Sequence, residues 1–226
     1  DGQEDFAVAE FEANIKETQV SYSNALQAKV RVGGEHVHYL TGPLARFKLF
    51  RNRLHPAAQN VADEVLVGGA ENNPFASILI RAVEVIHALE DAKFNLQNLG
   101  DLGGCCGLVS DIRLQSGFGC AATEAPRGVL YHSYRLNDRG EITTATIIPP
   151  TSQNQLSIED DLRHLVAENL NLDDEALGSL CERAIRNYDP CISCAAHFLK
   201  IERLNINRAE VCDAPIANWN WQLLKK

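Results

Sequence analysis

Two cysteines and a histidine near the C-terminal end of the sequence have a spacing that permits metal or redox chemistry. Asp189 and Pro190 precede Cys191, and Cys194 and His197 follow at successive steps of three. An aspartate followed by a proline is a typical helix start. The sequence therefore predicts a helix from Asp189 that carries both thiols and the imidazole on roughly one face, with Cys191 in its first turn, where the thiolate form is favoured.

Several kinds of site compete for this C-x-x-C pair. Two small buried cysteines would serve packing alone. A thioredoxin-like redox pair requires a strand-to-helix context, whereas a predicted helix precedes this segment. Zinc requires two further ligands, and the adjacent Cys105 and Cys106 have an awkward spacing for chelation. Haem attachment requires a histidine directly after the second cysteine, where Ala195 stands. The spacing alone leaves the packing, redox and metal interpretations open.

An arginine and a threonine are predicted to meet at the open end of a β-hairpin. Residues 128–150 are rich in Val, Tyr, Thr and Ile, and residues 137–140 supply turn chemistry. A register symmetric about this turn places Arg127 opposite Pro150 and Thr151. The segments TEAPRG and PPTSQNQ would then form one wall, with an arginine and two hydroxyl groups facing a common space. The alternative is an ordinary hairpin mouth with a solvated arginine.

Composition excludes several classes of protein. The 226 residues include 30 acidic and 21 basic side chains, a formal net charge of -9, which argues against binding nucleic acid. No apolar run approaches the roughly 18 residues that a membrane span needs. Seven cysteines are too few, and odd in number, for a disulfide scaffold. We therefore expect a cytoplasmic protein with reduced thiols, some of them metal ligands.

The strongest helical pattern lies within residues 71–96. Asn73 is suited to the N-cap and Pro74 to the first helical position. Six apolar residues recur there near a period of 3.6, namely Phe75, Leu79, Val83, Ile86, Leu89 and Phe94.

The remaining elements are predicted to be two helices, several loops and the hairpin. One helix is expected to start at a Ser157 cap, and another to run from about Asp173 to Tyr188, before a proline. The glycine-rich stretches LGDLGGCCG and SGFGC are expected to be loops, and residues 1–32 a poorly packed lead-in. The predicted fold class is mainly α with a small antiparallel β-hairpin or sheet.

Five segments together resemble the catalytic large subunit of [NiFe]-hydrogenases. EAPRG, PTSQNQ and DPCISCAAH occur in the order and approximate spacing of that family, and YLTGPLARF and NPFASILIRAVEVIHALEDA are also similar to it. The resemblance covers roughly residues 25–200 and favours the soluble, cytoplasmic, NAD-reducing branch. It implies a hydrogenase large-subunit-like fold and the reversible cleavage of H2 to protons and electrons.

The resemblance also implies a set of site residues. In that family the active site holds nickel and iron, and the iron carries CO and cyanide. By resemblance, Cys191 is a terminal nickel ligand and Cys194 bridges the two metals, a role suited to soft thiolates. Arg127 lies over the open metal position as a candidate base or electrostatic partner, and Asp189 belongs to the charged canopy that orders it. The implied cyanide pocket is lined by Pro126, Arg127 and Thr151.

The sequence lacks one part of the family pattern. The family takes its other two metal-binding cysteines from an N-terminal RxCxxC element behind an RGxE motif, and neither is present here. Cys105, Cys106 and Cys120 do not reproduce that element. We therefore expect residues 1–197 to be the C-terminal portion of a large subunit, which agrees with the absence of methionine.

The stretch after His197 is the second departure. In the family a nickel-dependent endopeptidase cuts just after the corresponding histidine, which then binds a buried magnesium or iron ion or closes the core. Residues 198–226 are still present here, with Trp219 and Trp221 among them. The resemblance thus predicts an uncleaved maturation peptide. The alternative is a permanent extension in a homologue that has lost the chemistry.

The sequence supports three hypotheses of function. A catalytic hydrogenase portion would contain nickel and would have as partners an iron–sulfur small subunit, an NAD-reducing diaphorase module and a maturation endopeptidase with its chaperone. A truncated or unprocessed metal-free homologue with a structural or assembly role would show neither nickel nor CO and cyanide infrared bands. A two-cysteine thiol redox protein would form a reversible disulfide between Cys191 and Cys194.

Overall fold

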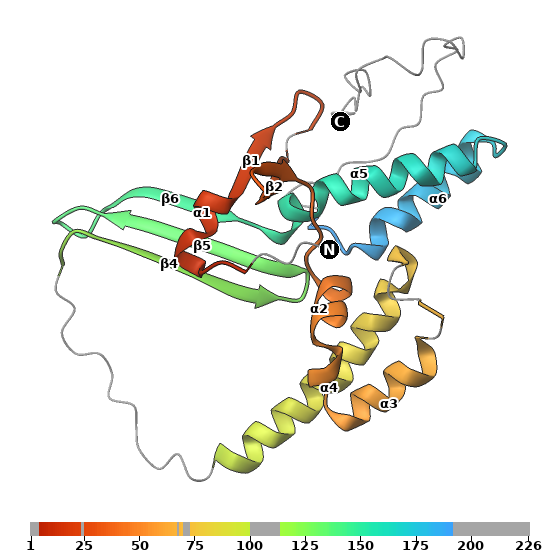
Figure 1. Cartoon of the computed structure of the whole chain (residues 1–226), viewed down its shortest axis with the longest axis horizontal. Helices are drawn as coiled ribbons and strands as arrows, with labels where there is room; N and C mark the ends of the chain where they lie inside the picture. Colours follow the sequence, from red (N-terminus) through yellow and green to blue (C-terminus); the bar gives the residue numbers. More distant parts are fainter. Residues whose placement is uncertain (1–4, 24, 67, 70–72, 100–113, 192–226) are drawn as a thin grey trace. The chain divides into compact units, whose positions relative to one another are not determined.

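The computed structural model describes residues 5–23, 25–66, 68–69, 73–99 and 114–191 (Figure 1). The chain divides into two compact units. The first comprises Asp1–Asn14 and Leu40–Pro150, and the second comprises Ile15–Tyr39 and Thr151–Lys226. Each unit contains helices and a three-stranded antiparallel sheet. The predicted mainly helical class with a small antiparallel sheet is therefore confirmed, with two sheets instead of one.

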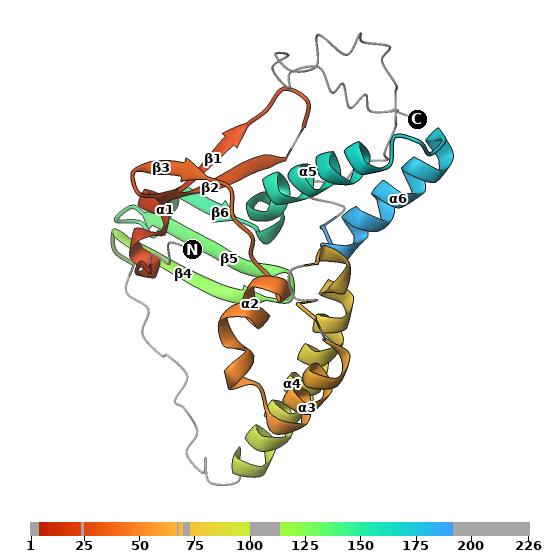
Figure 2. The same cartoon turned by 45° about the vertical axis from the view of Figure 1, so that its right-hand side comes forward.

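Three helices of the first unit enclose a hydrophobic core. They are α2 (Pro43–Phe50), α3 (Pro56–Val65) and α4 (Ser77–Asn98), and the short 3-10 helix η2 (Arg51–Arg53) follows α2 directly. Both α2 and α3 pack against α4, and Figure 2 shows α3 running alongside it. The buried core residues are Leu44, Phe47, Ala58, Ala62, Leu66, Ala76, Ile80 and Val83. Ala58 and Ala62 of α3 are fully buried, which lets this helix approach its neighbours closely.

Helix α4 starts as the sequence predicts. The Asn73 side chain accepts the Phe75 N–H at 2.9 Å, and Pro74 begins the 3-10 turn η4 (Pro74–Ala76) that leads into α4. The six periodic apolar residues do not form one buried face, because Val83 is fully buried but Leu89 is 65% exposed.

The second element of the first unit is a β-meander. Its strands are β4 (Gly117–Ala125), β5 (Gly128–Leu136) and β6 (Ile142–Ile148), with β5 in the middle. The predicted SGFGC loop is wrong, since these residues enter β4 and Cys120 pairs with Ser133. Cross-strand pairing along the whole of β5 outweighs the low strand propensity of two glycines.

The predicted turn between β5 and β6 is confirmed, but the symmetric register is wrong. The Asn137 side-chain oxygen accepts the N–H groups of Arg139 at 2.9 Å and Glu141 at 3.0 Å. Glu141 thus joins the loop, and a further irregularity follows beside Arg135 and Leu136. The longer loop and the irregularity each add one residue on the β6 side. The pairing is therefore displaced from the symmetric register, and Tyr131 pairs with Ile148.

The lead-in is better packed than predicted. Phe11, in the short helix α1 (Phe11–Asn14) after the 3-10 turn η1 (Val8–Glu10), stacks on Tyr131 with ring centroids 4.4 Å apart. Both rings are buried. The Tyr131 and Ser133 hydroxyls donate to the Glu12 carboxylate. Residues 5–14 therefore cover one face of the β4–β6 sheet.

The second unit joins a small sheet to two helices. Strands β1 (Ile15–Gln19), β2 (Leu26–Val32) and β3 (Glu35–Val37) form an antiparallel sheet in that order. The helices are α5 (Pro150–Glu168) and α6 (Asp174–Asn187). The predicted α6 is confirmed: the Asp173 carboxylate caps it by accepting the Ala176 N–H at 2.8 Å. Its buried face is formed by Leu177, Cys181 and Ala184.

Helix α5 begins eight residues earlier than predicted, at Pro150 instead of at Ile158 after a Ser157 cap. The Ser157 hydroxyl donates to the Tyr39 carbonyl at 3.0 Å and lies inside the helix. The overlooked signal is the Pro149-Pro150 pair, because proline is well suited to the first helical position.

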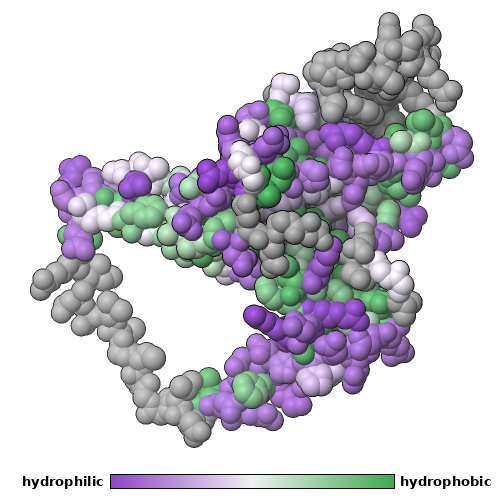
Figure 3. Space-filling model, in the orientation of Figure 1, coloured by the Kyte–Doolittle hydropathy of each residue, from purple (hydrophilic) through white to green (hydrophobic). Residues whose placement is uncertain are grey.

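Within the described ranges, none of the helices is both long and apolar enough to cross a membrane. On the face shown in Figure 3, hydrophilic side chains predominate, with apolar patches between them.

Candidate metal centre

Pro126 and Arg127 form the two-residue turn between β4 and β5. Ala125 and Gly128 are the last paired residues on either side of this turn, and Pro126 and Arg127 themselves are exposed. Because ladder hydrogen bonds hold both flanking strands, the backbone position of Arg127 is set by the sheet. Two of the predicted site residues therefore sit at the tip of a hairpin.

This turn is packed closely against the segment before α2. Gly128 has φ 134°, and a Cβ there would lie 2.5 Å from the Thr41 methyl carbon. Gly42 has φ 97°, and a Cβ there would lie 2.6 Å from the Arg127 carbonyl oxygen. The Val129 N–H also donates to the Thr41 hydroxyl at 3.2 Å. Only glycine permits this approach from both sides.

In the second unit, the predicted site residues Thr151 and Cys191 are in contact. The Cys191 backbone N–H donates to the Thr151 hydroxyl oxygen at 3.2 Å, across 40 residues of sequence. Thr151 lies in the first turn of α5 and is 5% exposed, and Cys191 is half-buried. The start of α5 thus fixes the chain that carries the first of the two cysteines.

The start of α5 is buried although it is polar. Thr151, Ser152, Gln153 and Asn154 are each at most 5% exposed. The Ser152 hydroxyl donates to the Glu17 carboxylate at 2.8 Å. Burial raises the pKa of Glu17, and the bond from Ser152 partly opposes this. Buried polar groups persist where such partners exist, so this helix end is tied to β1.

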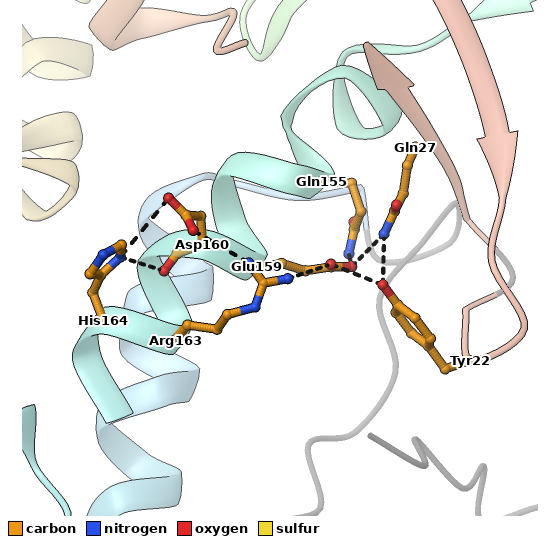
Figure 4. Close-up of polar contacts among 7 residues, drawn as sticks. All are labelled: Tyr22, Gln27, Gln155, Glu159, Asp160, Arg163 and His164. Atoms are coloured by element: carbon orange, nitrogen blue, oxygen red, sulfur yellow. Dashed lines mark hydrogen bonds and ion pairs between the residues drawn. The ribbon is translucent and has the colours of Figure 1, made fainter. Parts of the chain in front are cut away.

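A second polar network holds α5 to the β1–β2 hairpin, and Glu159 is its centre (Figure 4). Gln27 donates to one Glu159 carboxylate oxygen at 2.7 Å, and Tyr22 donates to the other at 3.1 Å. Gln27 is 3% exposed, and Arg163 lies 3.7 Å from the same carboxylate. Burial, followed by the Glu159 charge, raises the pKa of Tyr22 against the opposing bond from Gln27.

Asp189 ends α6 and does not begin a new helix. Its backbone is left-handed, with φ 49°, and its N–H donates to the Arg186 carbonyl at 3.0 Å. The Tyr188 hydroxyl, which donates to Asp161, anchors this helix end to α5. Pro190 and Cys191 are not helical, so the predicted helix start at Asp189 is wrong.

The physical reason lies in the following proline. Proline disfavours the right-handed helical conformation of the residue before it, and aspartate tolerates the left-handed region better than most residues do. The helix-dipole argument for a Cys191 thiolate consequently does not apply.

Part of the predicted site cannot be compared with the structure. Cys194 and His197 lie outside the described residues, as does the boundary between residues 1–197 and 198–226. Arg127 belongs to the first unit and Thr151 to the second, so their meeting stays a prediction. Within residues 5–191, as far as they are described, no group of three or more His, Cys, Asp or Glu side chains could hold a metal ion.

The two other described cysteines lie within regular secondary structure. Cys181 is 3% exposed on α6, and burial raises the pKa of its thiol. Cys120 lies in β4, opposite Ser133. Neither is a predicted ligand.

A family model described as nickel-dependent hydrogenase matches residues 35–197. The chain belongs to this family.

Two curated relatives show how much of a hydrogenase subunit the chain represents. The sulfhydrogenase 1 subunit alpha of Pyrococcus furiosus is 31% identical over 208 residues, which are 89% of this chain and 45% of the relative. The NAD-reducing hydrogenase HoxS subunit beta of Cupriavidus necator is 31% identical over 174 residues, 74% of this chain and 36% of the relative. The chain thus spans less than half the length of these hydrogenase subunits.

Solved structures show that the fold is shared. A crystal structure of an NAD+-reducing [NiFe]-hydrogenase in the H2-reduced state has a TM-score of 0.73 and 24% sequence identity, covering 85% of this chain and 43% of that one. A [NiFeSe] hydrogenase variant from Desulfovibrio vulgaris Hildenborough has a TM-score of 0.57 and 20% identity, covering 82% and 45%. At these identities the likeness concerns the fold alone.

Thr41 and Gly42 support the Pro126–Arg127 turn, and the sequence patterns do not reveal this contact. Their one signal is the Gly42-Pro43 break in YLTGPLARF, which predicts a turn but does not indicate what the turn packs against. The partner of a positive-φ glycine is a tertiary contact and has no local signature.

Proposed function

We propose that this chain is the C-terminal portion of the catalytic subunit of a [NiFe]-hydrogenase that cleaves H2 reversibly into protons and electrons. The observation that carries the proposal is the hydrogen bond from the Cys191 N–H to Thr151. It joins the segments DPCISCAAH and PTSQNQ, whose resemblance to the family assigns them to one site. The family match over residues 35–197 includes both segments.

Cys191, Cys194 and His197 are the proposed metal ligands. Thiolate sulfur is the donor that nickel and low-spin iron prefer, and the half-buried Cys191 on its Thr151 anchor is compatible with that role. Two further thiolates would come from an N-terminal RxCxxC element outside this sequence. When bound, a nickel–iron centre with CO and cyanide on the iron supplies the site at which H2 is polarised. We infer that His197 holds a magnesium or iron ion.

The residues around this centre would control charge. A guanidinium stays protonated near neutral pH, so Arg127 would place a fixed positive charge at the tip of its turn. A fixed cation stabilises the charges that separate when H2 is cleaved. We infer that Asp189 pairs with Arg127 in the assembled enzyme.

The cyanide pocket would be formed by Pro126, Arg127 and Thr151. Because the Thr151 oxygen accepts the Cys191 N–H, its hydroxyl hydrogen can be donated to an anionic ligand such as cyanide. Such donors around a metal ligand tune the metal.

The proposed partners follow from the relatives. A portion of a catalytic subunit requires an iron–sulfur small subunit to carry electrons away, and similarity to the HoxS subunit beta supports a diaphorase module that reduces NAD. A maturation endopeptidase with its chaperone would remove residues 198–226. We infer a cytoplasmic location, where NAD is reduced and thiols stay free.

The deciding experiment uses the complete large subunit, purified anaerobically with its small subunit. Nickel and iron content, infrared absorption in the CO and cyanide region, and H2-dependent dye reduction are measured on one sample. We expect nickel, iron, the CO and cyanide bands and H2 oxidation together. A folded protein without nickel and without those bands would contradict the proposal and favour the structural homologue. A metal-independent, reversible Cys191–Cys194 disulfide would favour the thiol redox protein.

A further inference from the structure

Arg46 connects the Pro126–Arg127 turn to the helical core of the first unit. It lies in α2, which runs beside the turn end of the β4–β6 sheet in Figures 1 and 2. Its guanidinium donates to the carbonyl of Ala125, the last residue of β4, at 2.9 Å and to the carbonyl of Pro126 in the turn at 2.8 Å. It also donates to the Glu124 carboxylate at 2.5 Å. Three consecutive residues before Arg127 are therefore bound by one side chain.

The other side of the guanidinium is fixed by α4. Its Nε and Nη2 atoms donate to the two Glu84 carboxylate oxygens at 2.7 and 2.8 Å, a bidentate pair. The side chains of Arg46 and Glu84 are 18% and 25% exposed, so water competes with this pair less than on an open surface. Burial alone would lower the pKa of Arg46, but the bonds to Glu84 and Glu124 outweigh it and raise the pKa.

All five N–H donors of Arg46 are engaged. Nε binds Glu84, Nη1 binds Glu124 and the Ala125 carbonyl, and Nη2 binds Glu84 and the Pro126 carbonyl. A lysine ammonium has three donors without the planar fork and cannot satisfy five acceptors in this geometry. This position therefore requires the planar five-donor guanidinium of arginine, and a positive charge alone would not satisfy it.

The same stretch of chain supports the turn from a second direction. Thr41 and Gly42 lie directly before α2. A Cβ added at Gly128 would lie 2.5 Å from the Thr41 methyl carbon, and a Cβ added at Gly42 would lie 2.6 Å from the Arg127 carbonyl oxygen. Arg46 binds the residues before Arg127. Gly42 packs against the Arg127 carbonyl, and Thr41 packs against Gly128, the residue after it. The backbone of Arg127 is consequently fixed on both sides by residues 41–46.

We propose that Arg46, held by Glu84, is a positioning residue that sets where the Arg127 guanidinium stands at the hydrogenase site. The inference rests on the proposed function, because it assigns Arg46 an effect through Arg127. Arg46 itself contacts the turn and does not need to touch metal or H2. Displacement of a positioned group by about 1 Å can cost on the order of 100-fold in rate.

The test compares variants of the complete large subunit with its small subunit. Arg46→Lys, Arg46→Gln and Glu84→Gln are measured for nickel and iron content, thermal unfolding, infrared bands, and kcat and KM for H2 across pH. Glu84→Gln is informative because, among the described contacts, Glu84 binds Arg46 and not the turn. Arg51→Gln is the matched control, since Arg51 pairs with exposed Asp63 in the same helical region at 2.5 Å.

We expect the three variants to keep their metals and to lose about 10- to 100-fold in kcat, with a smaller change in KM. Their cyanide bands should shift, because Pro126 and Arg127 line the proposed cyanide pocket. Arg46→Lys should recover only part of the loss, and Arg51→Gln should match the wild type. A purely structural role would lower the unfolding temperature without shifting the bands of the metal-loaded fraction.

An Arg127→Lys variant separates this inference from the proposed function. If Arg127→Lys inactivates the enzyme but the Arg46 and Glu84 variants retain wild-type kcat and cyanide bands, the positioning role is refuted and the proposed function stands. If Arg127→Lys is as active as the wild type, the role of Arg127 fails, and the inference fails with it. Should Arg46→Gln not accumulate metal, Arg46→Lys and Glu84→Gln decide by the same two measurements.

Discussion

At the scale of single residues, the bond between the Cys191 N–H and Thr151 defines how a cysteine is presented. Thr151 is buried at the start of α5, which the Ser152–Glu17 hydrogen bond ties to β1, whereas Cys191 is half-buried after the end of α6. The thiol thus belongs to an irregular segment whose backbone is held at one defined point. Cys181, in the middle of α6, has neither the exposure nor the irregular backbone, and it provides the contrast for a test.

Replacing Cys191 with serine in the complete protein should abolish nickel retention, because a serine hydroxyl is a poor ligand for a soft metal. Cys181→Ser should keep nickel, since Cys181 is a small buried residue whose thiol pKa is raised by burial. It should lower the free energy of unfolding by about 1–3 kcal/mol through burial of a hydroxyl. Nickel is measured by elemental analysis after gel filtration, and equal loss from both variants would remove the special role of Cys191.

Tyr131 gives the first unit a predictable response to alkaline pH. Burial, followed by the bond to Glu12, raises its pKa from 10.0 to about 12. Since the folded pKa lies above the unfolded one, this stabilisation is complete below pH 10 and is lost as pH rises through 12. At about 1.4 kcal/mol per pKa unit, the loss is at most about 3 kcal/mol.

Tyr131→Phe should remove that part of the pH dependence. Other tyrosines also have raised pKa values, among them Tyr39 and Tyr188, so the quantity to compare is the difference between wild type and variant. Denaturant unfolding at pH 9 to 12 should show a shallower decline for the variant. Parallel curves would mean that Tyr131 does not carry the effect.

Residue patterns were sufficient where one local contact decides the structure. The Asn73 and Asp173 caps each depend on a side chain and an N–H two or three residues away, and both are legible in the sequence. Asp189 is harder, because Asp-Pro is compatible both with a helix start and with a left-handed residue after a helix. Which of the two conformations Asp189 adopts depends on where α6 ends. The Tyr188 hydroxyl donates to Asp161 of α5 and so anchors that end, and this contact is not local in the sequence.

At the scale of elements, the hairpin tip at Pro126–Arg127 shows how a proposed site residue is positioned. The β4–β5 ladder, α2 and the segment before α2 all converge on it. Sequence periodicity predicts the β5–β6 hairpin and α4, yet it misses β4 because Gly117 and Gly119 lower the strand signal. It also does not give the register, which an extra loop residue and an irregularity beside Arg135 displace. Such insertions leave no mark on the alternation of residues.

Gly128→Ala should displace the turn and destabilise the first unit by more than about 1 kcal/mol. The added Cβ would lie 2.5 Å from the Thr41 methyl, and φ 134° is unfavourable for alanine. Gly117→Ala is the matched control in the same sheet, where nothing lies within 4 Å of the added atom. The measurement is the denaturation midpoint of both variants. If they are equally stable, the close approach of Thr41 to the turn is not required for folding.

At the scale of the whole molecule, the chain spans less than half of its curated relatives, and its longest described helix carries apolar residues on two faces. Helix α4 buries Ile80 and Val83, but Ile78, Val85 and Leu89 on another face are each more than half exposed. The spacing of apolar residues near a period of 3.6 identifies such a segment as a helix. When the helix has two apolar faces, the spacing does not show which face lies in the core. Leu89 therefore belongs to the periodic apolar pattern and is nevertheless exposed.

Maturation is the property that only the complete protein can test. We expect a nickel-loaded, H2-oxidising protein to end at His197, without residues 198–226. Cleavage there would give His197 a free carboxylate, an oxygen ligand of the kind that a hard cation such as magnesium prefers, and would remove Trp219 and Trp221. The described chain is already irregular at Pro190 and Cys191, so no helix from Asp189 needs to unwind first. Intact-mass measurement of the active fraction is decisive: full activity with residues 198–226 attached would mean that the extension is part of the working enzyme.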